Sequence, residues 1–328
     1  MKFSVGYRLT DNDSFMEAIK TYRDSIGEIY FSVIGIPNGR GDSWNDGFSP
    51  AEAAVRQDAE LRELAGCGFS MNLLLNAMCY GEDTLSRAFY NKLGDTLDYC
   101  ISAYGTDSVT TTSPIIAKFI KNNFEGVSVR ASVNMEIGTV EGMEYLSDHF
   151  DGFYLKRELN RDFSKIEELT AWCCENGKRL HMLANSGCLN HCSAHVFHDN
   201  LVAHENDIVK MDNAFTFEGV CKSFLSKEGN RKRFLDCTNF VRPEDIHLYE
   251  KYFTHVKLAT RVSEAPEKIL RAYCTGKWAG NLTALLEPNH SALFEPTGFP
   301  GCDVAGTICE KKLVYSETRS FPIKNGTN

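Results

Sequence analysis

Two cysteines, Cys188 and Cys192, stand three residues apart in the segment Asn185-Ser-Gly-Cys-Leu-Asn-His-Cys192. This segment directly follows the apolar run 180–184, which predicts a β-strand. Both thiols therefore follow the end of a strand, and Cys221 and Cys237 come next along the chain. Thiolates are soft ligands that suit zinc and iron–sulfur clusters. The pattern predicts a metal centre held by Cys188, Cys192, Cys221 and Cys237.

The same cysteines are open to other interpretations. Cys-x3-Cys is a looser signal than a repeated Cys-x-x-Cys, and four unlinked core cysteines would give the same spacing. His191, His195 and His198 crowd the segment, and on a helix they would share one face. Imidazole suits zinc better than it suits a cluster, so zinc is the alternative metal.

Other catalytic signatures are weak in this chain. The sequence has neither a Gly-x-Ser-x-Gly elbow nor a His-Glu-x-x-His helix. Carboxylates that could act as acids or bases are present, although such groups are often caps or salt-bridge partners. They are Asp42, Asp46, Glu136, Glu158 and Glu218.

Composition narrows the class of protein. The chain has 328 residues, of which 43% are hydrophobic and 24% charged, as in ordinary globular proteins. A net charge of −9 argues against general DNA or RNA coating. Neither a membrane span nor a signal peptide is visible, so we expect a cytoplasmic protein. Its 12 cysteines are then expected to be buried residues or metal ligands instead of disulfides.

Short β-type runs alternate with amphipathic helical stretches over most of the chain, which predicts a (β/α)8 barrel of the TIM type. We expect residues 1–275 to form this barrel and residues 276–328 to form a C-terminal extension packed on it, carrying Cys302 and Cys309. The predicted strands are Phe3–Tyr7, Glu28–Ile34, Met71–Met78, Ser108–Thr112, Val127–Met135, Gly152–Lys156, Leu180–Ala184, Phe234–Phe240 and Val256–Ala259.

Proline marks the start of several helices, because its missing N–H has no partner to lose at the first helical position. Ser113-Pro114, Arg242-Pro243 and Ala265-Pro266 each precede an apolar stripe with helical spacing. A further helix with Ile166, Leu169 and Cys173 on one face should precede the strand before Cys188 and end at Gly177.

Several segments in sequence order resemble one known family. They are the cysteine segment 185–192, Leu155-Lys-Arg-Glu-Leu159, Phe234-Leu-Asp-Cys-Thr-Asn-Phe-Val-Arg-Pro-Glu-Asp245 and Val256-Lys-Leu-Ala-Thr-Arg261. Together with Ile29-Tyr30 through Arg40, and with Asn76, they are similar to the collagenase-like peptidase family U-32. The resemblance covers roughly residues 1 to 275.

The resemblance implies a barrel with four cysteines around a [4Fe-4S] cluster, and several members are oxygen-independent hydroxylases of ubiquinone precursors or RNA bases. Cys188 and Cys192 match two family cysteines, Cys237 lies near a later one, and Cys221 has a loose counterpart. Five residues would then line the cavity mouth. Arg157 and Glu158 would be catalytic, with Glu158 as the acid or base, and Arg40, Asn76 and Arg261 would bind substrate. Arg40 and Arg157 would grip an anionic group.

One departure bears on the reaction. The best-known hydroxylases have a longer segment between their first cysteines than the compact Gly-Cys-x3-Cys found here. We therefore predict an iron–sulfur enzyme that carries out a redox or hydroxylation-type modification of a small molecule, a peptide or an RNA base. The alternatives are a metal-dependent peptidase with zinc, and a non-catalytic, cluster-bearing partner of a homologous subunit.

Overall fold

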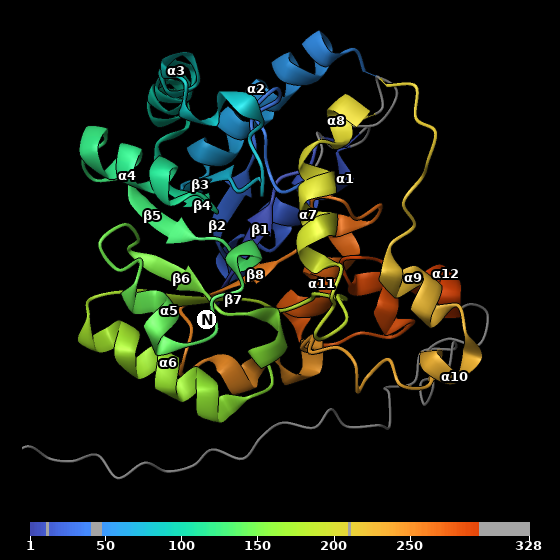
Figure 1. The fold of residues 1–328 in the computed structure, drawn as a ribbon. Coiled ribbons are helices and arrows are strands. Elements are labelled where there is room, and N and C mark those ends of the chain that lie inside the picture. Colours follow the sequence, from blue (N-terminus) through green and yellow to red (C-terminus); the bar gives the residue numbers. More distant parts are fainter. Residues whose placement is uncertain (11–12, 41–47, 209–210, 295–328) are drawn as a thin grey trace, which may run out of the picture.

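A computed structural model of the protein describes residues 1–10, 13–40, 48–208 and 211–294 (Figure 1). Its eight strands are all parallel and close into a barrel in the order β1 to β8. This confirms the predicted (β/α)8 barrel. The strands are β1 Lys2–Gly6, β2 Ile26–Phe31, β3 Ser70–Leu75, β4 Thr106–Thr111, β5 Ser128–Ala131, β6 Gly152–Tyr154, β7 Arg179–Leu183 and β8 His255–Leu258.

The longer helices lie outside the barrel and bury their apolar stripes against it (Figure 1). They are α1 Ser14–Thr21, α2 Pro50–Gly66, α3 Arg87–Tyr104, α4 Pro114–Asn123, α6 Phe163–Glu175 and α11 Pro266–Thr275. The shorter α-helices are α5 Val140–Glu144, α7 His195–Ala203, α8 Glu205–Ile208, α9 Val220–Leu225, α10 Glu228–Arg231 and α12 Ser291–Phe294. The 3-10 helices are η1 Arg23–Ser25, η2 Glu82–Leu85, η3 Val133–Met135, η4 Arg157–Leu159, η5 Pro243–Tyr249 and η6 Leu282–Leu285.

The helix starts follow the predicted chemistry. Ser113 caps α4 by accepting a hydrogen bond from the Ile116 N–H, with Pro114 at the first helical position. Pro266 likewise stands at the first position of α11, although Ala265 before it provides no side-chain cap. The stretch after Pro243 forms the 3-10 helix η5 instead of an α-helix, although Ile246 and Tyr249 still point inward as the spacing predicts.

The prediction of a strand at Phe234–Phe240 is wrong. Strand β7 pairs directly with β8, so the ring closes without a further strand. The stretch instead forms turns whose aromatic side chains join the main hydrophobic core: the rings of Phe234 and Phe240 lie 6.2 Å apart, and the ring of Phe294 lies 5.3 Å from that of Phe234. Phe234, Leu235 and Phe240 are buried in these turns, and burial of apolar side chains is common to strands and to packed turns.

The interior of the barrel is polar at its centre. Glu28 on β2 and Arg130 on β5 form an ion pair of 2.5 Å across the interior, with both side chains buried. Asn72 bridges to Ser108 and Thr110 on the neighbouring strand β4. Because the polar groups of its core are hydrogen-bonded to one another, the barrel can accommodate charged side chains deep in its interior.

Two chain segments cover the carboxyl ends of the strands. The connection 184–254 between β7 and β8 carries α7 to α10 and the predicted cysteine ligands, and the stretch 276–294 follows α11. Asn185 joins them, because its side-chain amide donates to the carbonyls of Ala259 and Leu285. Residues 276–294 therefore contact the barrel end. The division at residue 275 stays a prediction, and Cys302 and Cys309 lie outside the described residues.

Cysteine burial differs in part from expectation. Cys100 and Cys173 are buried, and Cys67, Cys79 and Cys274 are half-buried, but Cys174 is exposed on the outer face of α6. None of the helices in the described part of the chain has the length and apolar character needed to cross a bilayer.

Candidate active site

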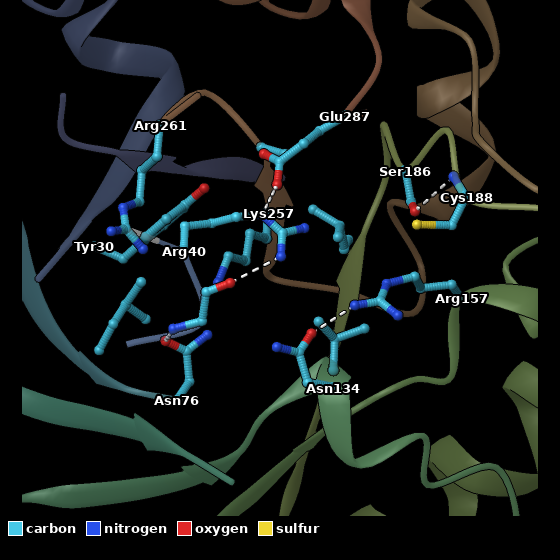
Figure 2. Close-up of a pocket in the computed structure, with 15 residues that line it drawn as sticks. Tyr30, Arg40, Asn76, Asn134, Arg157, Ser186, Cys188, Lys257, Arg261 and Glu287 are labelled. Atoms are coloured by element: carbon cyan, nitrogen blue, oxygen red, sulfur yellow. Dashed lines mark hydrogen bonds and ion pairs between the residues drawn. The ribbon is translucent and has the colours of Figure 1, made fainter. Parts of the chain in front are cut away.

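A chamber of about 50 Å³, here called the inner chamber, lies at the carboxyl ends of the barrel strands (Figure 2). This is the end at which (β/α)8 enzymes place their active sites. Residues from most of the strand ends line it, together with the two covering segments. They are Tyr30, Gly39, Arg40, Leu74, Asn76, Val133, Asn134, Arg157, Leu183, Ser186, Cys188, Lys257, Ala259, Arg261 and Glu287.

The inner chamber carries an excess of positive charge. Arg40, Arg157, Arg261 and Lys257 line it, against a single lining carboxylate, Glu287. The Arg40 Nε lies 2.7 Å from a Glu287 carboxylate oxygen, and both side chains are largely buried. Three guanidinium groups and the Lys257 amine, with one counter-ion in a partly enclosed space, favour the binding of an anion.

Hydrogen bonds fix Arg261 and the loop that carries Arg40. The Arg261 guanidinium donates to Ser32 Oγ at 2.7 Å and to Asn38 Oδ1 at 2.8 Å. Asn76 accepts from the Gly39 N–H at 3.0 Å. A Cβ at Gly39 would come within 2.7 Å of the Asn76 amide nitrogen, so only glycine allows this close approach.

Arg157 belongs to a polar network at the edge of the chamber. Its guanidinium donates to Asn134 Oδ1 at 2.5 Å and lies 2.6 Å from His195 Nε2. The other ring nitrogen of His195 lies 2.6 Å from a Glu136 carboxylate oxygen. Asp199 also lies 3.1 Å from Nε2.

Asp199 is buried at the edge of this network. Its burial acts to raise the pKa of the carboxyl, but the hydrogen bond from His195 and the charge of Arg157 outweigh this and hold the pKa below its usual value. A buried carboxylate thus stays ionised beside Arg157, which keeps the guanidinium in place.

Lys257 lies at the floor of the inner chamber, on β8. Its side chain is buried, and its Nζ stands 4.0 Å from the ring centre of Tyr30 and 5.2 Å from that of Tyr154. Burial, and then the charge of Arg261, lowers the pKa of the Lys257 amine to about 7. No carboxylate of the described residues lies within ion-pairing distance of this amine.

A second chamber of about 210 Å³, the outer chamber, adjoins the first. Arg40, Cys188 and Glu287 line both chambers and so form their common wall. Cys192 and Cys221 line the outer chamber as well, with His195, His198 and Asp199, and with an apolar side formed by Leu189, Val202, Phe217, Val220 and Val262. Burial, and then the neighbouring Cys188 and Cys192, raises the pKa of the Cys221 thiol.

The cysteine segment is held tightly where it leaves β7. The backbone of Ser186 forms an isolated parallel β-bridge with that of Glu287, and the Gly187 N–H donates to the Glu287 carbonyl at 2.8 Å. A Cβ at Gly187 would lie 2.7 Å from the carbonyl oxygen of Pro288, which requires glycine there. Cys188 therefore follows a fixed backbone.

Glu158 supports this segment from outside the chambers and lines neither of them. Its carboxylate accepts from the His191 N–H at 2.5 Å and pairs with Lys156 at 3.0 Å. Burial acts to raise the pKa of Glu158, but these partners hold it below its usual value. Its predicted place at the cavity mouth therefore differs from its position in the structure. His191 lies outside α7 and so does not share a helical face with His195 and His198.

The donor set can be compared with the predicted cluster. Cys188, Cys192 and Cys221 line one chamber, and thiolates are the ligands that such a cluster takes. Cys237 does not line it, although its backbone carbonyl accepts from the Asn190 N–H at 2.7 Å, between Cys188 and Cys192. Among the described residues, no group of three or more His, Cys, Asp or Glu side chains is close enough to hold a metal ion as it stands.

The structure thus brings four of the five predicted mouth residues, Arg40, Asn76, Arg157 and Arg261, into one chamber. It also adds residues that the sequence did not single out for the site. Asn134, Glu287 and Lys257 are the main ones. Of these, only Lys257 could have been recognised from the sequence, because a lysine between apolar residues of a strand indicates a buried charge.

The fold defines a class, a (β/α)8 barrel with its candidate site at the carboxyl ends of the strands. Among solved structures, the U32 peptidase Mk0906 is similar, with a TM-score of 0.54 and 16% sequence identity over 78% of this chain and 92% of that chain. At this identity, the similarity establishes the barrel fold.

Weaker structural similarities exist as well. A mandelate racemase/muconate lactonizing enzyme-like protein from Rubrobacter xylanophilus aligns with a TM-score of 0.32 and 9% identity, over 62% of this chain and 50% of that one. An L-Ala-D/L-Glu epimerase aligns with a TM-score of 0.31 and 10% identity, over 61% and 54%. No family model matches the sequence, and no curated protein matches it significantly.

Proposed function

We propose that this protein is a U32-type enzyme that holds an iron–sulfur cluster in the outer chamber and modifies an anionic substrate bound in the inner chamber. The observation that carries the proposal is the common wall. Cys188 lines both chambers, so a group held by the cysteines would stand next to the arginine-lined space. The similarity of the fold to a U32 peptidase supports the family resemblance in the sequence.

Cys188, Cys192 and Cys221 would hold the cluster, with Cys237 as the fourth ligand after a local shift of its segment. When bound, such a cluster supplies a redox or Lewis-acid centre. The protein contributes the rest. Arg40 and Arg261 bind the substrate anion, and Arg157, fixed by Asn134 and His195, orients it.

The inner chamber also offers an apolar surface. Val133, Tyr154, Leu183 and Ala259 form a small buried apolar cluster, three members of which line the chamber. A substrate with a carboxylate or phosphate on one side and a hydrocarbon portion on the other matches both walls. Redox modification of such a compound, hydroxylation among the possibilities, is the reaction class that we propose.

Metal analysis of single cysteine variants tests the cluster. We expect protein purified without oxygen to contain iron and sulfide and to absorb in the visible region, and Cys188→Ser, Cys192→Ser and Cys221→Ser each to lose most of both. Cys174→Ser is the matched control, because Cys174 is exposed on α6, away from both chambers. Colourless wild-type protein without iron would refute the cluster.

A zinc hydrolase is the second candidate, because His195 and His198 line the outer chamber beside the three cysteines. The same metal analysis separates the two. One zinc per chain, lost in Cys192→Ser and His198→Ala together with peptide hydrolysis, would establish this candidate in place of the cluster enzyme. Iron with sulfide and no zinc would eliminate it.

A further inference from the structure

Lys257 has an environment that differs from that of the other cations of the inner chamber. Arg40 pairs with Glu287, Arg157 contacts Asn134, and Arg261 contacts Asn38. The Lys257 amine instead faces two tyrosine rings at the chamber floor, with no carboxylate of the described residues near enough to pair with it. Binding an anion does not require such an amine, since three guanidinium groups line the same chamber.

The side chain is also aimed at the space that a ligand would occupy. Lys257 follows Val256 on β8, and the alternation of the strand turns Val256 to the helices and Lys257 to the interior. Its neighbour across the ladder on β7 is Leu183, which lines the same chamber. The amine therefore meets the ligand at the closed end, while the arginines lie around it.

We infer that Lys257 is a nucleophilic amine that forms an imine with an aldehyde or ketone carbonyl of a small carboxylate-bearing substrate, such as a 2-oxo acid. The arginines bind the carboxylate, and the carbonyl carbon then faces the Nζ. This site does not depend on the cluster of the proposed function.

The step balances without an oxidant or a reductant. The lone pair of the neutral Nζ adds to the carbonyl carbon while the C=O π bond breaks, and the oxygen takes one of the two protons on that nitrogen to give a carbinolamine. The carbinolamine then expels its hydroxyl group, which leaves as water with a proton from nitrogen, and a C=N bond replaces the C=O bond. The inner chamber is the smaller of the two chambers, at about 50 Å³ against about 210 Å³, which favours a short substrate chain.

Several charges decide how readily this amine loses its proton. Burial and the cations Arg261 and Arg130 favour the neutral amine, while the carboxylates of Glu28 and Glu287 and the two tyrosine rings favour the ammonium. His181 on β7 also faces this interior, and burial lowers its pKa so that it stays neutral. The balance leaves the pKa of Lys257 at about 7, so the neutral amine is abundant at neutral pH.

Reductive trapping tests the inference on the full-length protein. Pyruvate and cyanoborohydride are added at pH 7, and the digested protein is mapped by mass spectrometry. We expect one reduced adduct per chain, on the tryptic peptide 252–261 with cleavage blocked at Lys257. An ordinary lysine is neutral in roughly one molecule per thousand at this pH, so a surface lysine should react about a hundredfold to a thousandfold more slowly.

Variants and probes sharpen the result. Lys257→Met should abolish the adduct, whereas Lys156→Met, which removes a lysine paired with Glu158 outside the chambers, should leave it unchanged. Acetone, which lacks the carboxylate, should give at most about a tenth of the yield, as should Arg261→Gln with pyruvate, because one lost charge-assisted bond is worth about tenfold or more.

The outcomes separate cleanly. Adducts spread over surface lysines, no adduct at all, or an unchanged yield in Lys257→Met would each overturn the inference. If Lys257→Met fails to fold, the pH profile of the wild type decides: trapping at Lys257 should reach half its maximum near pH 7, and a midpoint near that of free lysine would overturn the inference. Loss of iron in the cysteine variants would not affect this trapping, so the two proposals fail independently.

Discussion

Glu28 and Arg130 place an ion pair inside the barrel, below the inner chamber. Their side chains are almost fully buried, and one Glu28 oxygen has no hydrogen-bond partner among the described residues. Such a pair adds little net stability, because taking both charges out of water costs about as much as their attraction returns. Its effect is to hold charge beneath Lys257, whose pKa Glu28 acts to raise.

Removing one partner of this pair should be far more harmful than removing both. We expect Arg130→Met to lower the free energy of unfolding by about 3 to 5 kcal/mol, since it leaves the Glu28 charge buried alone. Glu28→Gln combined with Arg130→Met should recover most of that loss. Urea denaturation of the wild type, the two single variants and the double variant gives the coupling free energy between Glu28 and Arg130. A double variant as unstable as Arg130→Met would contradict this view.

At the scale of elements, the regular parts of the fold were predictable and the connections were not. Apolar runs such as 71–75 and 180–183 marked strands because both faces of a parallel strand are buried, and Ser113-Pro114 marked a helix because capping is local chemistry. The prediction of a strand at Phe234–Phe240 was wrong because a stretch of buried apolar residues within turns can have the same composition as a strand.

The candidate site shows the same division. Residues in the connections that follow strands, such as Arg40, Asn76 and Arg261, could be placed near one another because parallel strands end on the same side. Glu287 could not, because it reaches Arg40 from a segment 247 residues further along the chain. The low pKa of Lys257 was also hidden, because it depends on groups from several strands and not on its neighbours in sequence.

Asn185 connects three elements, and its replacement should loosen the cover of the site. Its side-chain amide bonds to both backbone groups of Ala259 and to the Leu285 carbonyl, all buried. Asn185→Ala leaves these groups without partners, so we expect a loss of about 2 to 4 kcal/mol in the free energy of unfolding. Limited proteolysis should cut first within residues 276–294.

The exposed Asn123, which bonds to one carbonyl on the surface of α4, offers a control for this variant. Asn123→Ala should change stability by less than about 0.5 kcal/mol and leave the proteolysis pattern as in the wild type. Equal effects of the two substitutions would mean that the contacts of Asn185 do not hold residues 276–294 on the barrel.

The whole barrel should become more stable as the pH rises from about 7 to about 8. The pKa of Lys257 is about 7 in the folded chain and about 10.5 when unfolded, so the unfolded chain binds more protons throughout this interval. Stability therefore increases with pH, by about 1 kcal/mol over this pH unit. Buried His181 adds to the slope only below about pH 6.5. The buried thiols of Cys100, Cys173 and Cys274 oppose the slope mainly above about pH 8, where they ionise in the unfolded chain, because burial raises their pKa values in the folded chain.

Chemical denaturation at a series of pH values measures this slope, and Lys257→Met identifies its source. The variant has no amine to titrate at this position, so its stability should be nearly flat between pH 7 and 8, and it should exceed that of the wild type most at the acid end of the interval. Lys156→Met should keep the wild-type slope. A wild-type profile that is flat or falls with pH would show that Lys257 keeps its proton inside the barrel, because only a neutral amine in the folded state makes stability rise here.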